Sequence, residues 1–297
     1  MQAGEKRQRK SKLKKGASWF GCGLMYFVLY IPIAVMIVYS FNKQQQNMMW
    51  EGFTVAWYGR LFRDRELMKV FQNTMIVSCS STVISVIIGA IAAYGISRFQ
   101  FKGKNLLMNI LYIPIVIPEI VMGVSLLIVY MGVHLPLNLF AMILAHVTFC
   151  APFVIITIRG RIGGMGLSEE EASMDLGANR RVTFLRVTLP MMAPAIMAGA
   201  FMAFTLSFDD LVVSNFVAGP NSTTLPIKVQ SMLKVGVTPE INALSTLIFA
   251  VLLTAGILAK LVSFALKKRA AKKEELLIAE TRKSSGKADQ LIAEAGG

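Results

Sequence analysis

Cysteine and histidine are scarce in this chain of 297 residues. The three cysteines, Cys22, Cys79 and Cys150, are odd in number and show no pairing pattern, which argues against a disulfide framework. We expect them to pack as small apolar residues inside helices. The two histidines, His134 and His146, lie too far apart in sequence to indicate a metal pair. The sequence therefore predicts no metal site and no bound cofactor, and we expect His146 to be hydrogen-bonded within a helix bundle.

The chain also lacks a nucleotide-binding loop. Such a loop requires Gly-x4-Gly-Lys followed by Ser or Thr, because backbone amides, a lysine and a hydroxyl together hold the phosphates and their metal ion. The only Gly-Lys pairs here, Gly103-Lys104 and Gly286-Lys287, lack both the earlier glycine and the hydroxyl. No constellation of catalytic side chains accompanies them. We therefore expect a protein that is not an enzyme and does not bind ATP by this route.

Acidic residues are few, 17 against 31 lysines and arginines, which leaves a net charge of +14. In a soluble protein this excess would suggest nucleic acid as a partner. However, 55% of the residues are hydrophobic, and they gather in runs long enough for helices of about 20 residues that cross a bilayer. The predicted fold is therefore all-α, a polytopic membrane protein with six transmembrane helices. The expected spans are 19–41, 70–97, 106–131, 137–158, 191–217 and 243–266.

The basic residues are distributed unevenly between the two sides of the predicted membrane. If the N-terminus is cytoplasmic, 23 of the 31 lie on the cytoplasmic side, seven lie outside and Lys260 falls within the last span. Cytoplasmic loops carry such an excess, so both termini are expected in the cytoplasm and nucleic acid is not needed as a partner. The run 19–41 is too long for a cleaved signal peptide and is expected to be a signal anchor.

The expected organisation has three parts. Residues 1–18 form a basic cytoplasmic tail, residues 19–266 form the six-helix membrane domain, and residues 267–297 form a charged cytoplasmic tail. The basic root of the last tail is expected to attract anionic membrane lipid.

A polar segment, 168–190, interrupts the apolar pattern on the predicted cytoplasmic side. Ser168 followed three residues later by Glu171 has the spacing of a capping box, so a short helix is expected to begin there. Gly177 permits the left-handed conformation that ends a helix, and Pro190 marks a further boundary. The pattern predicts a helix, a glycine turn and a second helix on the membrane surface, with Ala172 and Leu176 as a small apolar knob. A solvated loop between two spans is the alternative.

This segment resembles the EAA loop of ABC-importer permeases, the loop that binds a separate ATPase subunit. The family pattern is Glu-Ala-Ala, three residues, Gly, nine residues and Ile-x-Leu-Pro, with Ser173 and Val187 as the two mild departures here. The resemblance implies the type I permease fold, with ATP bound by the partner. The residues expected to couple to the ATPase are Glu170, Glu171, Ala172, Asp175, Leu176, Gly177, Leu189 and Pro190.

Three acidic residues, Glu119, Asp209 and Asp210, fall within predicted spans, where a carboxylate costs on the order of 3 kcal/mol to bury. Spacing on a continuous fifth helix would place Asp210 on one face with Ser207 and Ser214, and Asp209 about 100° away. One carboxylate is then expected to face a central pathway while the other is paired or capping. Pro114 and Pro118 are expected to kink the third span beside Glu119. The alternative is that these carboxylates only satisfy backbone groups or a neighbouring helix.

Three further stretches, 117–123, 205–210 and 235–243, resemble permease subunits of bacterial spermidine/putrescine ABC importers. The resemblance implies a multi-pass protein of the bacterial cytoplasmic membrane. Its implied partners are a second homologous permease, two cytoplasmic ATP-binding subunits and an extracytoplasmic polyamine-binding protein. The residues expected along the substrate pathway are Asp209, Asp210, Glu119, Phe208 and Ser207.

Two other transport functions stay open at this point, and a membrane scaffold without transport is a more remote third. An ABC importer for another small solute, such as ferric ion, thiamine or an opine-like compound, would carry the same EAA-like loop. An ion-coupled secondary transporter would use the buried acids to bind the coupling ion, but it predicts inverted repeats, which this sequence does not show. The sequence does not distinguish spermidine from putrescine.

Overall fold

Helices and their breaks define the architecture. The computed structural model describes residues 2–44, 49–236, 238–254, 256–258 and 260–261. The helices are α1 (Gln2–Tyr39), α2 (Ala56–Arg63), α3 (Arg65–Arg98), α4 (Lys104–Val116), α5 (Glu119–Gly132), α6 (Leu139–Gly163), α7 (Ser168–Asp175), α8 (Arg180–Thr183), the π-helical turn η1 (Phe184–Thr188), α9 (Leu189–Phe208), α10 (Val212–Val217) and α11 (Leu225–Val235). The chain divides into two units, Met1–Tyr58 with Thr238–Gly297, and Gly59–Val237.

Five helical segments are long and apolar enough to cross a membrane, and a bent pair makes a sixth. The five are Trp19–Tyr39, Arg65–Arg98, Leu139–Gly163, Arg180–Phe208 and Pro239–Leu258, and the bent pair is α4 with α5. The predicted number of spans is therefore confirmed if the bent pair counts as one. The predicted tail at 267–297 lies outside the described residues.

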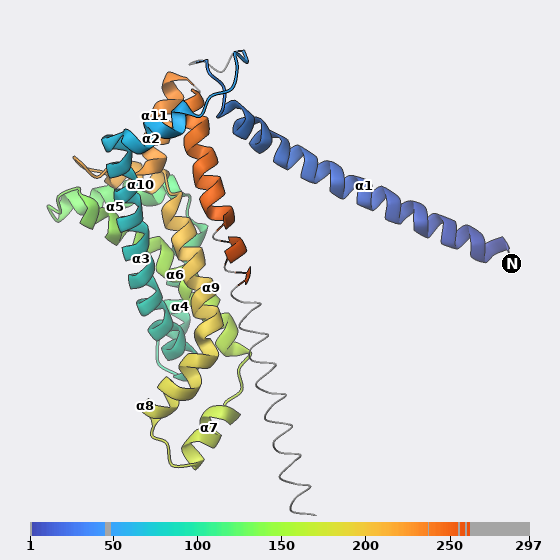
Figure 1. Ribbon diagram of the computed structural model, residues 1–297. Coiled ribbons are helices and arrows are strands. Elements are labelled where there is room, and N and C mark those ends of the chain that lie inside the picture. Colours follow the sequence, from blue (N-terminus) through green and yellow to red (C-terminus); the bar gives the residue numbers. More distant parts are fainter. Residues whose placement is uncertain (1, 45–48, 237, 255, 259, 262–297) are drawn as a thin grey trace, which may run out of the picture. The chain divides into compact units, whose positions relative to one another are not determined.

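The second unit is built around three helices, α3, α6 and α9, which pack side by side (Figure 1). Two glycines allow the close approach. A Cβ on Gly89 of α3 would lie 2.5 Å from a methyl group of Val154 on α6, and one on Gly199 of α9 would lie 3.2 Å from the same methyl. Small residues at helix contacts are typical of membrane proteins, where van der Waals packing replaces the hydrophobic effect as the main attraction between helices.

The third span is broken rather than kinked. α4 and α5 meet at 110°, so the distortion predicted beside Glu119 is confirmed at Pro118 and is larger than a kink, whereas Pro114 lies inside α4. Pro118 has no N–H for a helical hydrogen bond and disfavours helical backbone at the residue before it. Ile117 accordingly adopts φ −67° and ψ 137°, and α5 restarts at Glu119.

The fifth span is displaced from its predicted bounds at both ends. It begins at Arg180, since α8, η1 and α9 form one helix through Pro190, and it ends at Phe208 instead of continuing to residue 217. The N–H of Leu189 bonds to the carbonyl of Phe184, one residue beyond the usual α-helical partner. This π-turn accommodates the proline inside the helix. Pro190 lies in the first turn of α9, at the change from π-helix to α-helix, but the helical segment runs on from Arg180 without a break, so the predicted second helix is not separate from the span.

The cysteines differ in their surroundings. Cys150 is buried in α6, where its thiol contacts the backbone carbonyl of Ala203 on α9 at 3.5 Å. Cys22 in α1 and Cys79 in α3 are exposed in the chain, and all three cysteines lie within helices as expected.

Candidate functional site

The two helix breaks line one cavity in the second unit. The cavity has a volume of about 320 Å³, near the lower end of the range of small-molecule sites, roughly 300–1,000 Å³. Its walls come from the α4–α5 break, from the segment between α9 and α10, and from α6. The lining residues are Pro114, Ile115, Ile117, Glu119, Met122, Phe149, Phe153, Leu206, Asp209, Asp210, Leu211, Val212 and Val213.

All three acidic residues predicted for the substrate pathway line this cavity, and two of the three are exposed. Glu119 is the first residue of α5 and is exposed, and Asp209 directly follows α9 and is also exposed. The structure therefore brings together two carboxylates that are 90 residues apart in the sequence, and both are accessible to a solute.

Helix ends shape the charge of the cavity. A helix carries partial positive charge at its N-terminus and partial negative charge at its C-terminus. Glu119 complements the N-terminus of α5, and Asp210 complements that of α10. Asp209 instead follows the C-terminus of α9, and it has no cationic partner among the residues that the structure describes. Asp209 is therefore the carboxylate of this site that attracts a cation most strongly.

Asp210 is buried and has a different environment from Asp209. One carboxylate oxygen accepts from the N–H of Val213 at 3.3 Å, and the other accepts from the N–H of Ser214 at 2.7 Å. The second oxygen also lies 3.4 Å from Nε2 of His146. Asp210 thus stabilises the start of α10, and its side chain is engaged within the protein.

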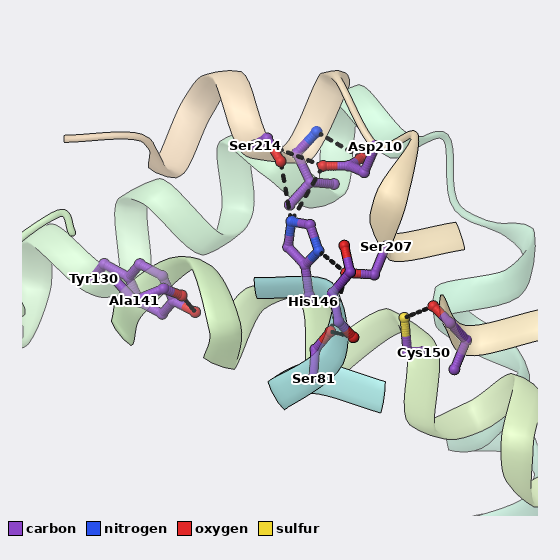
Figure 2. Close-up of polar contacts among 11 residues, drawn as sticks. Ser81, Tyr130, Ala141, His146, Cys150, Ser207, Asp210 and Ser214 are labelled. Atoms are coloured by element: carbon purple, nitrogen blue, oxygen red, sulfur yellow. Dashed lines mark hydrogen bonds and ion pairs between the residues drawn. The ribbon is translucent and has the colours of Figure 1, made fainter. Parts of the chain in front are cut away.

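His146 lies at the centre of a buried polar network (Figure 2). Its Nδ1 is 2.6 Å from the Ser207 hydroxyl, and its Nε2 is 3.0 Å from the Ser214 hydroxyl. Ser207 also shares a 3.0 Å hydrogen bond with Ser81 of α3. The prediction of a hydrogen-bonded bundle histidine is confirmed, and the network connects α3, α6, α9 and α10 around the second break.

The prediction that Ser207, Asp210 and Ser214 share one helix face assumed a continuous helix, and that assumption is wrong. The three residues still meet because the chain turns at Asp209 and each contacts His146. Ser207 is therefore engaged in the network and does not line the cavity.

The aromatic wall of the cavity also differs from the prediction. Phe208 stacks on Phe204, with ring centroids 5.6 Å apart, and it is absent from the lining. Phe149 and Phe153 of α6 line the cavity instead. Their spacing of four residues places them on one helix face, and the intervening Pro152 was the only signal in the sequence that could have drawn attention to them.

The EAA-like loop lies at the end of the α3–α6–α9 bundle away from α5 and α10 (Figure 1). Its first helix, α7, begins after Leu167, whose carbonyl accepts from the N–H of Glu171 at 2.8 Å. The predicted capping box is wrong, because Ser168 is already the first helical residue and its hydroxyl donates to the carboxylate of Glu169 at 3.1 Å.

The end of α7 has the conformation that the sequence predicted. Gly177 adopts φ +86°, its N–H bonds to the carbonyl of Met174, and the N–H of Ala178 bonds to that of Ser173. This pair of hydrogen bonds is the Schellman motif. The turn presents Leu176 to the surface with 91% of its area exposed, and Ala172 is exposed as well.

The other predicted coupling residues fall into three groups. Glu171 and Asp175 are exposed on α7, as expected for residues that meet a partner. Glu170 is buried in an ion pair with Arg98. Leu189 and Pro190 lie within the continuous helix from Arg180 and belong to the transition from loop to membrane span.

Comparison with known proteins identifies the family. Residues 85–272 match the model of the binding-protein-dependent transport system inner membrane component. The spermidine/putrescine transport system permease protein PotC of Escherichia coli K12 is 38% identical over 239 residues, which cover 80% of this chain and 90% of PotC. The chain belongs to the family of binding-protein-dependent transport system inner membrane components.

Two further comparisons support this assignment. The putrescine transport system permease protein PotI of Escherichia coli K12 is 39% identical over 243 residues, covering 80% of this chain and 86% of PotI. A chain in the crystal structure of a bacterial ABC transporter that imports the acidic polysaccharide alginate has the same fold. Its TM-score is 0.67 at 16% identity, and the match covers 85% of this chain and 97% of that chain.

The position of His146 in this importer family member leads to a prediction. We expect His146→Asn to lower the midpoint of thermal unfolding in detergent by roughly 2–12 °C, because a shorter side chain cannot reach both serine hydroxyls. A buried polar group left unpaired costs about 1–3 kcal/mol, and 1 kcal/mol shifts the midpoint by about 2–4 °C in a domain of this size.

The exposed histidine provides the matched control. His134 has φ 55°, which asparagine tolerates, so His134→Asn is expected to leave the midpoint within about 2 °C of the parent protein. Equal midpoints for the two variants would contradict a structural role for the His146 network.

Proposed function

We propose that this chain is the permease subunit of an ATP-driven importer of polyamines. The observation that carries the proposal is the cavity at the two helix breaks, where exposed Asp209 and Glu119 face apolar walls. The relatives PotC and PotI, named for spermidine and putrescine transport, support the same substrate class. The chain supplies the membrane pathway, and the chemistry of ATP belongs to a partner.

The cavity suits a flexible cation with methylene spacers. Ammonium groups interact favourably with Asp209 and Glu119, and the methylene segments contact Ile115, Ile117 and Leu206. Phe149 and Phe153 offer aromatic faces for cation–π contacts, worth about 0.5–2 kcal/mol each depending on desolvation. Ferric ion would favour a denser set of oxygen ligands, and no group of three or more potential metal-ligating side chains occurs within the described residues.

The partners follow from the family and from the exposed loop. We infer a second homologous permease beside this chain, two cytoplasmic ATP-binding subunits and an extracytoplasmic polyamine-binding protein. The exposed apolar surface of Leu176 and Ala172, flanked by Glu171 and Asp175, suits a groove on the ATP-binding subunit. The chain then lies in the bacterial inner membrane with α7 on the cytoplasmic side, in agreement with the excess of basic residues there.

A single helix connects the two sites. The helix from Arg180 to Phe208 has 29 residues and thus a length of about 43 Å, enough to run from the EAA-like loop to Asp209. Movement of α7 with the ATP-binding subunit would displace this helix at one end and the cavity wall at the other. Alternating access would follow, since the break after Phe208 allows α9 to move relative to α10.

Uptake by a reconstituted assembly tests the proposal. Proteoliposomes that contain this chain, its permease partner and the ATP-binding subunits, supplied with the binding protein, are expected to accumulate labelled spermidine or putrescine only with ATP. Ferric ion and thiamine in excess are expected not to compete. Uptake without the ATP-binding subunits, or full competition by either control solute, would contradict the proposal.

A further inference from the structure

Glu170 differs from every other residue of α7. It is the one buried residue of this helix, although a glutamate is strongly hydrophilic. Its neighbours Glu169 and Glu171 are exposed. Burial of a charged side chain in an otherwise exposed helix indicates that the side chain faces a partner inside the protein.

That partner is Arg98, the last residue of α3. Its Nη2 and Nε donate to the same carboxylate oxygen of Glu170, at 2.7 and 3.2 Å. The two side chains are 12% and 10% exposed, so water screens the pair only partly. Nη2 also lies 3.3 Å from the carbonyl of Gly166, on the segment that leads into α7. Arg98 therefore contacts both α7 and the segment that leads into it.

A second contact joins α7 to a different helix. The hydroxyls of Ser173 and Thr183 are 3.2 Å apart, and Thr183 belongs to α8, which continues into α9. Thus α7 is connected through Glu170 to α3 and through Ser173 to α9. Because α3 and α9 also pack against each other, a displacement of α7 reaches the bundle along two helices.

We propose that the Arg98–Glu170 ion pair transmits the motion of α7 to α3, and that Glu170 is not a contact to the ATP-binding subunit. The inference rests on the proposed coupling role of α7. Arg98 and Glu170 are therefore positioning residues. Leu176 and its neighbours contact the ATP-binding subunit, and the ion pair holds α7 against the helix bundle. Without the pair, ATP hydrolysis would move α7 with less displacement of the cavity wall.

The test measures substrate uptake and ATP hydrolysis in the same proteoliposomes of the complete assembly. We expect Glu170→Gln and Arg98→Gln each to lower the amount of polyamine imported per ATP hydrolysed by roughly tenfold, because each removes a charge-assisted hydrogen bond. The ATP-binding subunit is expected to co-purify as with the parent protein. The control, Glu169→Gln, removes an exposed carboxylate one residue away and is expected to leave the ratio within about twofold.

The reversed pair separates a specific interaction from a loss of folding. We expect Arg98→Glu combined with Glu170→Arg to recover the ratio to within about threefold of the parent protein, short of full recovery because both helix dipoles oppose the exchange. A double variant no better than the single variants, an unchanged ratio in the single variants, or loss of the ATP-binding subunit in Glu170→Gln would each overturn the proposal. The proposed function fails separately, if the parent assembly takes up polyamine without the ATP-binding subunits, and the coupling role of α7 fails if Leu176→Asp retains both the ATP-binding subunit and uptake.

Discussion

Uptake driven by ATP is expected to fall to background when Leu176 is replaced by aspartate. The parent side chain is 91% exposed in the chain alone, held outward by the glycine turn after α7. In an apolar pocket of the ATP-binding subunit this leucine would stabilise the complex, since complete burial of a leucine side chain contributes about 1.5–3 kcal/mol. Aspartate adds the cost of burying a charge in the same pocket. The measurement is co-purification of the ATP-binding subunit together with uptake in proteoliposomes.

Two controls accompany this prediction. Leu176→Met keeps an apolar side chain of similar volume and is expected to retain at least about half of the uptake. Leu176→Asp should not affect the membrane content of the chain, because the side chain contacts little of its own protein. If Leu176→Asp retained both the ATP-binding subunit and uptake, α7 would not be the docking element.

The second large effect is expected at Asp209. We predict that Asp209→Asn raises the KM for polyamine uptake by about 10- to 100-fold, since hydrogen bonds to charged groups are worth about 1.5–3 kcal/mol. Glu119→Gln should have a smaller effect, because that carboxylate also complements the N-terminus of α5. The combination of both changes is expected to abolish uptake. Initial rates over a range of labelled spermidine and putrescine concentrations measure these effects.

The neighbouring aspartate provides the contrast. Asp210→Asn neutralises the carboxylate that accepts two backbone hydrogen bonds at the start of α10. We therefore expect this variant to lower the midpoint of thermal unfolding and to change the KM for polyamine less than Asp209→Asn does. Asp209→Glu keeps the charge and should stay within about fivefold of the parent KM. A larger rise in KM for Asp210→Asn than for Asp209→Asn would reverse the assignment of the pathway carboxylate.

The sequence predicted the parts of the fold that depend on local composition. Apolar runs located the spans, and Gly177 located the turn, because only a residue that tolerates positive φ ends α7 in this way. Pro118 indicated a distortion beside Glu119. Its size, 110°, depends on how α5 packs against α10 and therefore could not be read from the proline alone.

The parts that failed depend on contacts between distant segments. Ser81 lies 126 residues from Ser207, and Arg98 lies 72 residues from Glu170, so no local pattern links them. The sequence predicted that one aspartate faces a pathway while the other is capping, but it assumed that the helix continues past Phe208. The break assigns the capping role to Asp210, because its carboxylate accepts from the N–H groups of Val213 and Ser214 where α10 begins.

Labelling of one cysteine at the tip of α7 tests the central claim most directly. Leu176→Cys is introduced into a chain whose Cys22, Cys79 and Cys150 are replaced by alanine, and a membrane-impermeant maleimide is applied to oriented vesicles. We predict labelling only in inside-out vesicles, and strong protection when the ATP-binding subunit is added. Labelling from the outer face, or equal labelling with and without that subunit, would contradict the claim that α7 is the cytoplasmic element through which a separate ATPase drives transport.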